Sequence, residues 1–254
     1  MTAIADFFFE ELGYDVYLPL LHFHGLKDPQ GMEGVELEEW KANVNFAITK
    51  ADERAKEVSI GGLSTDGTLS FDMAVRDSRV NGALYLFSAA LDLAFSPGGT
   101  FGEIAEELLT TFLVDILDNN LKPMIGENLY RYAHVDLDGA RELAFLIKET
   151  DELQEQYRRD GDTEILFPKP VFAAHSESDT TAFIKGITKL EDKSILSQFR
   201  FYRIPAEVEV SHASLVLKDN IYPRNATPPT KALEDRNPLF ADMMSAIKAF
   251  AIST

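Results

Sequence analysis

Apolar residues follow two alternating patterns along this chain, short continuous runs and longer stretches with an apolar residue every three or four positions. The runs predict buried β-strands over residues 14–21, 57–63, 83–91, 170–174 and 199–204. The longer stretches predict helices over residues 4–12, 37–55, 68–75 and 238–251. Because strands and helices alternate, the sequence predicts an α/β domain built on a mostly parallel sheet flanked by helices.

The alternation stops after residue 93. The cluster Ser96-Pro97-Gly98-Gly99 breaks regular structure, and residues 101–159 then have an almost wholly helical pattern. This change predicts one α/β domain over residues 1–254, interrupted by a helical insertion over residues 95–163. An insertion at the carboxyl edge of a parallel sheet would lie over the place where such sheets bind ligands.

Composition excludes several classes of protein. The 24 Lys and Arg against 42 Asp and Glu give a net charge of −18, which disfavours binding to nucleic acid or to an anionic membrane surface. The absence of cysteine removes disulfides and thiolate chemistry. The start of the chain has no basic segment typical of a secretory signal, and no apolar run reaches the roughly 18 residues of a membrane span. We therefore expect a cytoplasmic protein.

Ser64 is the first candidate for chemistry. The apolar run Val58-Ser59-Ile60 leads into Gly61-Gly62-Leu63-Ser64, and a helical segment follows. A strand, a glycine turn, a serine and a helix in this order raise a hydroxyl to the top of a parallel sheet, where it can act as a nucleophile. The alternative is a serine that only begins a helix.

A serine nucleophile needs a base and a group that orients the base, and in a parallel sheet these come from the ends of other strands. Asp179 follows the predicted strand 170–174, and His212 follows the strand 199–204. Serine, acid and histidine in this chain order are typical of one class of hydrolase. Glu177 competes with Asp179 for the role of the acid.

With these residues in place, the chain resembles α/β-hydrolases of the monoacylglycerol lipase and carboxylesterase type. The matching pieces occur in family order: Gly13-Tyr14-Asp15-Val16-Tyr17-Leu18-Pro19, His24-Gly25, Trp40, Gly61-Gly62-Leu63-Ser64, and the loops of Asp179 and His212. The resemblance extends from near the first residue to the last helix.

The resemblance implies a serine hydrolase that cleaves carboxylic esters, either acylglycerols or short to medium acyl esters, with no dissociable cofactor. It implies that Ser64 is the nucleophile, that His212 is the general base and that Asp179 orients His212. It also implies that the backbone N–H of Thr65 forms part of an oxyanion hole and that residues 95–163 form a cap over the acyl pocket.

Two features depart from the family pattern. Asp66 stands where the family has a small residue, and its negative charge near a developing oxyanion is expected to slow catalysis. The N-terminal strands of the family, with the loop that supplies the other oxyanion donor, are missing from the sequence given. Strands 14–21 and 57–63 must therefore pair directly, leave a gap or recruit a strand from another molecule, which favours a homo-oligomer.

Three alternatives remain open. The departures favour a catalytically weak protein that binds a ligand or partner under its cap. His22 and His24, at alternate positions of a predicted strand, could instead begin a zinc site. The apolar stretches 7–9 and 108–114 belong either to the core or to a lipid pocket.

Overall fold

A four-stranded parallel sheet forms the centre of the molecule. The computed structural model describes residues 1–25, 32–92, 128, 130, 137–159, 164–227 and 229–254. The strands are β1 (Ile60–Leu63), β2 (Leu84–Phe87), β3 (Val171–Ser176) and β4 (Phe199–Ile204), in the spatial order β1-β2-β3-β4. Every pairing is parallel, so the carboxyl ends of all four strands lie at one edge.

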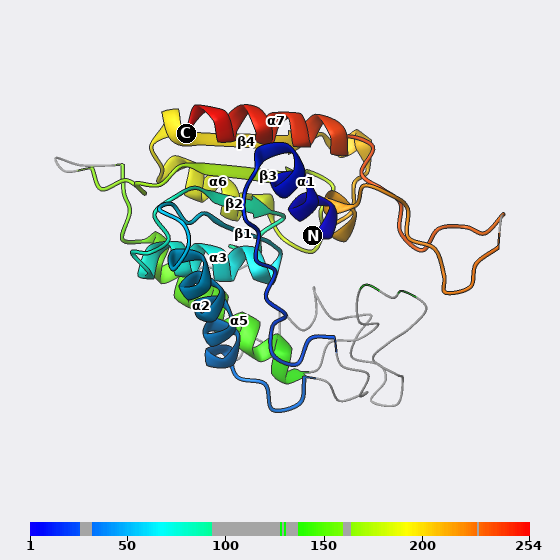
Figure 1. Cartoon of the computed structure of the whole chain (residues 1–254), viewed down its shortest axis with the longest axis horizontal. Coiled ribbons are helices and arrows are strands. Elements are labelled where there is room, and N and C mark those ends of the chain that lie inside the picture. The colour runs from blue at the N-terminus through cyan, green and yellow to red at the C-terminus, as the bar shows by residue number, and fades with distance from the viewer. Residues whose placement is uncertain (26–31, 93–127, 129, 131–136, 160–163, 228) are drawn as a thin grey trace.

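Two helices cover one face of the sheet. These are α1 (Thr2–Leu12) and the last helix, α7 (Phe240–Ser253), which lie together beside β3 and β4 in Figure 1. Alternate residues of the central strands, such as Tyr85 and Phe172, pack against Ile4, Met243 and Phe250 from these helices. The two-residue repeat of a strand explains this arrangement, because neighbouring side chains point to opposite faces.

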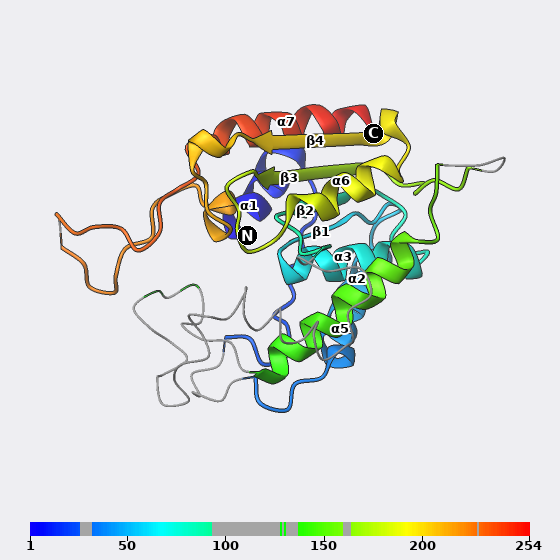
Figure 2. The ribbon, with the colours of Figure 1, turned by 180° about the vertical axis from the view of Figure 1, so that it is seen from behind.

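The other face is covered by α3 (Thr65–Arg76) and α6 (Ile184–Asp192), and α6 lies along β3 in Figure 2. Here the intervening strand residues are buried, and Leu84, Leu86 and Val171 pack against Phe71 of α3 and Ile187 of α6. Strands β2 and β3 are therefore covered on both faces, which explains why their sequences are continuous apolar runs.

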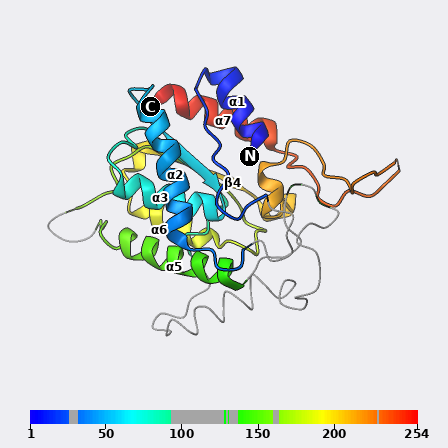
Figure 3. The same cartoon turned by 60° about the horizontal axis from the view of Figure 1, so that its bottom comes forward.

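Two further helices extend the α3 side of the molecule, α2 (Leu37–Asp52) and α5 (Leu137–Gln154). Trp40 of α2 and Leu143 and Ile147 of α5 are buried together. Figure 3 shows α5 on the side away from α1 and α7. The ammonium of Lys41 lies 2.8 Å from the Glu149 carboxylate across this contact. Helix α5 thus packs against the α/β domain although it falls within the range expected for the insertion.

Most predicted elements are confirmed, with shifts of a few residues at their ends. The strand predicted over residues 14–21 is wrong, because this stretch forms no strand and residues 15–20 are exposed. Strand β1 correspondingly has β2 as its only partner among the described residues and forms an edge of the sheet. Residues 14–21 therefore do not pair with β1, and recruitment of a strand from another molecule remains a prediction.

The remaining part of the predicted insertion, including the apolar stretch 108–114, lies outside the described residues. In the N-terminal apolar stretch, Phe7 and Phe8 pack against the core, whereas Phe9 is exposed. Among the helices that the structure describes, none has the length and apolar character needed to cross a membrane.

Candidate active site

Ser64 stands at the sharp turn between β1 and α3. Its backbone has φ 54° and ψ −120°, a conformation that a residue other than glycine adopts only under strain. The backbone N–H of Ser64 donates to the carbonyl of Phe87 at 3.0 Å, which ties the turn to the end of β2. Although Ser64 precedes the first residue of α3, its side chain makes no capping hydrogen bond. The strained turn therefore does not serve to cap the helix.

Gly62 allows α3 to approach β1 closely behind this turn. A Cβ atom at Gly62 would lie 2.3 Å from the backbone carbon of Asp66 and 2.5 Å from its Cβ. The absence of a side chain at Gly62 thus provides the space that the side chain of Asp66 begins to fill. Gly62, opposite Asp66, therefore accommodates the larger side chain that stands where the family has a small residue.

The charge of Asp66 is less well accommodated than its bulk. Burial raises the pKa of the Asp66 carboxyl, and the positive charges of His24 and of the Met1 amino group offset that rise only in part. Water still reaches the residue, which is exposed, so solvent screens part of the effect. Asp66 lies in the first turn of α3, where the helix dipole favours a negative charge.

Asp179 and His212 come together at the carboxyl ends of β3 and β4. Nδ1 of His212 lies 2.7 Å from Oδ2 of Asp179, although 33 positions separate the two residues. Oδ1 of the same carboxylate accepts hydrogen bonds from the backbone N–H groups of Thr181, at 2.8 Å, and Ala182, at 3.1 Å. Burial raises the pKa of Asp179, but the bonds from His212 and the two amides outweigh it, and the pKa is lowered overall.

This arrangement leaves Nε2 as the ring nitrogen of His212 that does not face the carboxylate. An imidazole held by a buried carboxylate through Nδ1 can accept a proton at Nε2, as a general base requires. The competing acid, Glu177, is exposed, and its backbone N–H bonds to the carbonyl of Ile204. The hydrogen bond to His212 belongs to Asp179.

His175 is a buried neighbour of this pair that the sequence analysis did not select as a site residue. It lies in β3 with no exposed surface, its Nε2 is 2.9 Å from the carbonyl oxygen of Ala182, and it is 3.7 Å from Oδ2 of Asp179. Burial lowers the pKa of His175, so the ring is neutral. A histidine inside an apolar strand is typical of a core, and only its distance of four positions from Asp179 could have indicated a role.

The structure therefore brings Asp179 and His212 into direct contact and places Ser64 on the same edge of the sheet, at the end of β1. The N–H of Thr65 belongs to the first turn of α3, where backbone N–H groups have no partner within the helix. These four residues are the ones that the sequence singled out.

The histidine pair at 22 and 24 has a different surrounding. Residues 22–25 form a turn rather than a strand, Nε2 of His22 lies 3.4 Å from Glu39, and the ring of His24 lies edge-on to Trp40. Within the described parts of the chain, no three His, Asp or Glu side chains gather in a way that could hold a metal ion.

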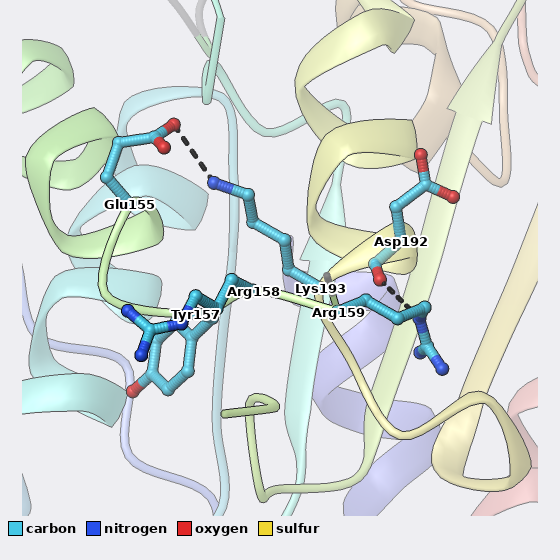
Figure 4. A pocket seen from close by; sticks show the side chains of 6 residues that line it. All are labelled: Glu155, Tyr157, Arg158, Arg159, Asp192 and Lys193. Atoms are coloured by element: carbon cyan, nitrogen blue, oxygen red, sulfur yellow. Dashed lines mark hydrogen bonds and ion pairs between the residues drawn. The ribbon is translucent and has the colours of Figure 1, made fainter. Parts of the chain in front are cut away.

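A cavity of about 670 Å³ lies elsewhere, between the end of α5 and the end of α6 (Figure 4). Its lining residues precede β3 and β4 in the chain, so it lies at the amino ends of the strands, opposite the edge of Ser64. Lys193 bonds to Glu155 at 2.9 Å, and the Arg159 guanidinium donates to the carbonyl of Asp192 at 2.8 Å. The cations of this cavity are thus partly used by their own neighbours.

Comparison with solved structures identifies the fold. The chain is similar to a structure reported for LipS and LipT, two metagenome-derived lipolytic enzymes, with a TM-score of 0.66 and 17% identity. The similarity covers 100% of this chain and 88% of that chain. It is also similar to the monoacylglycerol lipase of Paleococcus ferrophilus, with a TM-score of 0.52 and 13% identity over 86% of this chain and 76% of that one.

A third similar structure is Est1E of Butyrivibrio proteoclasticus with bound ferulic acid, with a TM-score of 0.50 and 13% identity over 88% of this chain and 70% of that one. No model of a protein family matches the chain, and no curated protein sequence does. The parallel sheet, the strained serine turn and these similarities define a protein with the α/β-hydrolase fold.

Proposed function

We propose that this protein is a serine hydrolase that cleaves carboxylic esters through an acyl-enzyme on Ser64. The observation that carries the proposal is the 2.7 Å hydrogen bond between His212 and Asp179, on the sheet edge where the strained turn presents Ser64. The similar structures, reported for lipolytic enzymes, a monoacylglycerol lipase and a ferulic acid complex, support acyl esters as the substrate class.

In the proposed reaction, Nε2 of His212 takes the proton of Ser64 as its Oγ attacks the ester carbonyl carbon. The negative charge that develops on the carbonyl oxygen is stabilised by the N–H of Thr65 at the start of α3. His212 then returns the proton to the leaving alcohol as the ester C–O bond breaks. Water, deprotonated by His212, releases the carboxylic acid from Ser64.

A fluorophosphonate probe tests this proposal, because it reacts covalently with activated serines. We expect the probe to label the unaltered protein at Ser64, and Ser64→Ala to abolish both labelling and hydrolysis of nitrophenyl esters. Ser70→Ala is a matched control, because this serine of the same helix bonds to the carbonyl of Asp66 and is buried away from the edge. A folded protein that the probe does not label would contradict the proposal.

The second candidate function is a catalytically weak protein that binds a ligand or partner. The place of Asp66 favours it, because this acidic residue lies in the first turn of α3, two residues after the proposed nucleophile, where an anion would oppose a developing oxyanion. This candidate predicts slow labelling, negligible ester turnover and recovery of activity in Asp66→Gly. Ester hydrolysis at ordinary esterase rates by the unaltered protein would exclude it.

A further inference from the structure

We propose that His175 is a positioning residue that fixes the loop holding Asp179, so that the orientation of His212 depends on it. The inference deepens the proposed function and rests on it for the role of His212. The geometry itself comes from three consecutive contacts. Nε2 of His175 meets the Ala182 carbonyl at 2.9 Å, the Ala182 N–H meets Oδ1 of Asp179 at 3.1 Å, and Oδ2 meets Nδ1 of His212 at 2.7 Å.

The direction of the first hydrogen bond follows from the partner. A carbonyl oxygen only accepts, so the proton of the neutral ring is on Nε2, and Nε2–H donates to Ala182. Nδ1 is buried and has no hydrogen-bond partner among the described atoms, which suits a nitrogen that carries no proton. His175 therefore acts as a fixed donor from β3 to the loop.

Both ends of this contact are buried. His175 lies in β3, which pairs with β2 on one side and with β4 on the other, and its side chain is completely buried. Asp179 and Ala182 are buried as well, so water cannot replace a lost donor at low cost. Loss of the bond would free the Ala182 carbonyl and allow the loop, with the carboxylate of Asp179, to move relative to His212.

Three substitutions separate this role from a general role in the core. The amide nitrogen of Gln reaches the place of Nε2 and keeps the donor, whereas the amide of Asn reaches only the place of Nδ1. Leu fills the space and has no donor. We expect His175→Gln to keep the rate of the unaltered protein within about threefold, and His175→Asn and His175→Leu to lower it roughly tenfold.

The decisive measurement is one that mere core packing would not change. We expect the Nδ1 proton of His212, which faces a carboxylate, to give a far-downfield proton NMR signal, and we expect the labelling rate of Ser64 by a fluorophosphonate to depend on pH. We expect His175→Leu to weaken or move the NMR signal and to shift the midpoint of the labelling rate to lower pH. A displaced Asp179 stabilises the imidazolium less, which explains the direction.

The proposal is overturned if folded His175→Leu retains the signal and the midpoint of the unaltered protein, or if His175→Gln is as impaired as His175→Asn. Should His175→Leu fail to fold, the Gln and Asn pair decides, since both are polar and differ in reach. Failure of the proposed function is a separate result, because absence of labelling at Ser64 in the unaltered protein leaves the NMR comparison fully interpretable.

Discussion

Asp66 and Asp179 follow β1 and β3 at the same edge of the sheet, and the pKa values of their carboxyl groups shift in opposite directions. Asp179, beside β3, receives hydrogen bonds from the His212 ring and two backbone amides, and its pKa is lowered in spite of burial. Asp66, beside β1, has no hydrogen bond to its carboxyl among the described residues, and burial raises its pKa.

The two carboxyls therefore differ in the number of donors that face them, and their pKa values shift in opposite directions. Beside β3, the loop amides of Thr181 and Ala182 and the ring of His212 supply those donors. At the β1 end the strand is an edge, and residues 15–20, predicted to continue the sheet, are exposed instead. Both oxygens of the Asp179 carboxylate thus accept hydrogen bonds, whereas the carboxyl group two residues after the proposed nucleophile accepts none among the described residues.

The largest expected effect comes from removing the charge of the well-bonded carboxyl. We expect Asp179→Asn to lower kcat/KM for nitrophenyl esters by roughly 10³–10⁴-fold, because His212 loses the acceptor for its Nδ1 proton. The matched control is Glu177→Gln, which removes the charge of an exposed carboxyl in the same loop and should change the rate by less than about twofold. Equal losses in both variants would mean that the wrong acid has been assigned.

The next effect concerns the turn at the β1 end. We expect Gly62→Ala to lower the free energy of unfolding by about 3 kcal/mol, because its Cβ would meet the backbone of Asp66 at 2.3 Å. Gly13→Ala is the control, since Gly13 has φ 73° but nothing within 4 Å, and should cost about 1 kcal/mol. Urea unfolding measures both. Adding Asp66→Gly should not rescue Gly62→Ala, because the closest atom belongs to the backbone.

The sequence predicts the region around Asp179 and His212 more completely than the region around Asp66. Strand β4 coincides with the predicted range 199–204, and the order of Ser64, Asp179 and His212 along the chain indicated which side chains to compare. Parallel β–α units explain this success, since they bring residues that follow different strands to one edge.

Two results could not be predicted, for physical reasons. The pattern of residues 14–21 shows which side chains favour a strand, but a strand also needs a partner, and in the structure these residues do not pair with the open edge of β1. His175 was missed because its apolar neighbours are those of a core residue, and only the folded loop shows that its donor reaches Ala182.

A smaller effect is expected from changing the poorly bonded carboxyl. We expect Asp66→Gly to raise kcat for nitrophenyl esters by roughly tenfold, because an anion near the developing oxyanion disfavours the transition state. Asp66→Asn separates charge from bulk, since it keeps the side chain that Gly62 accommodates. Equal gains in the two variants would assign the effect to charge, and a loss in both would show that the carboxyl assists the reaction.

The smallest expected effect is a change in how stability depends on pH. The pKa of His175 is lowered by burial below its usual 6.5, so the unfolded chain binds the extra proton first as the pH falls. The contribution of His175 is therefore complete above pH 6.5 and is lost below it, by up to about 1.4 kcal/mol per pH unit. His175→Gln should remove this loss, which urea unfolding at several pH values would measure.

The stability of His175→Gln must be compared with that of the unaltered protein at each pH, because the carboxyl groups of Asp66 and Asp179 also titrate. Because the pKa of Asp66 is raised in the folded protein, Asp66 stabilises the folded protein at low pH and lowers its free energy of unfolding as the pH rises. This effect has the opposite sign to the rise in stability with pH that His175 causes. The lowered pKa of Asp179 removes stability only as the pH falls below its usual 3.8. Between about pH 4 and 6.5, the difference between His175→Gln and the unaltered protein therefore reports the His175 ring together with its electrostatic interaction with His212. Parallel stability curves there would contradict a lowered pKa for His175.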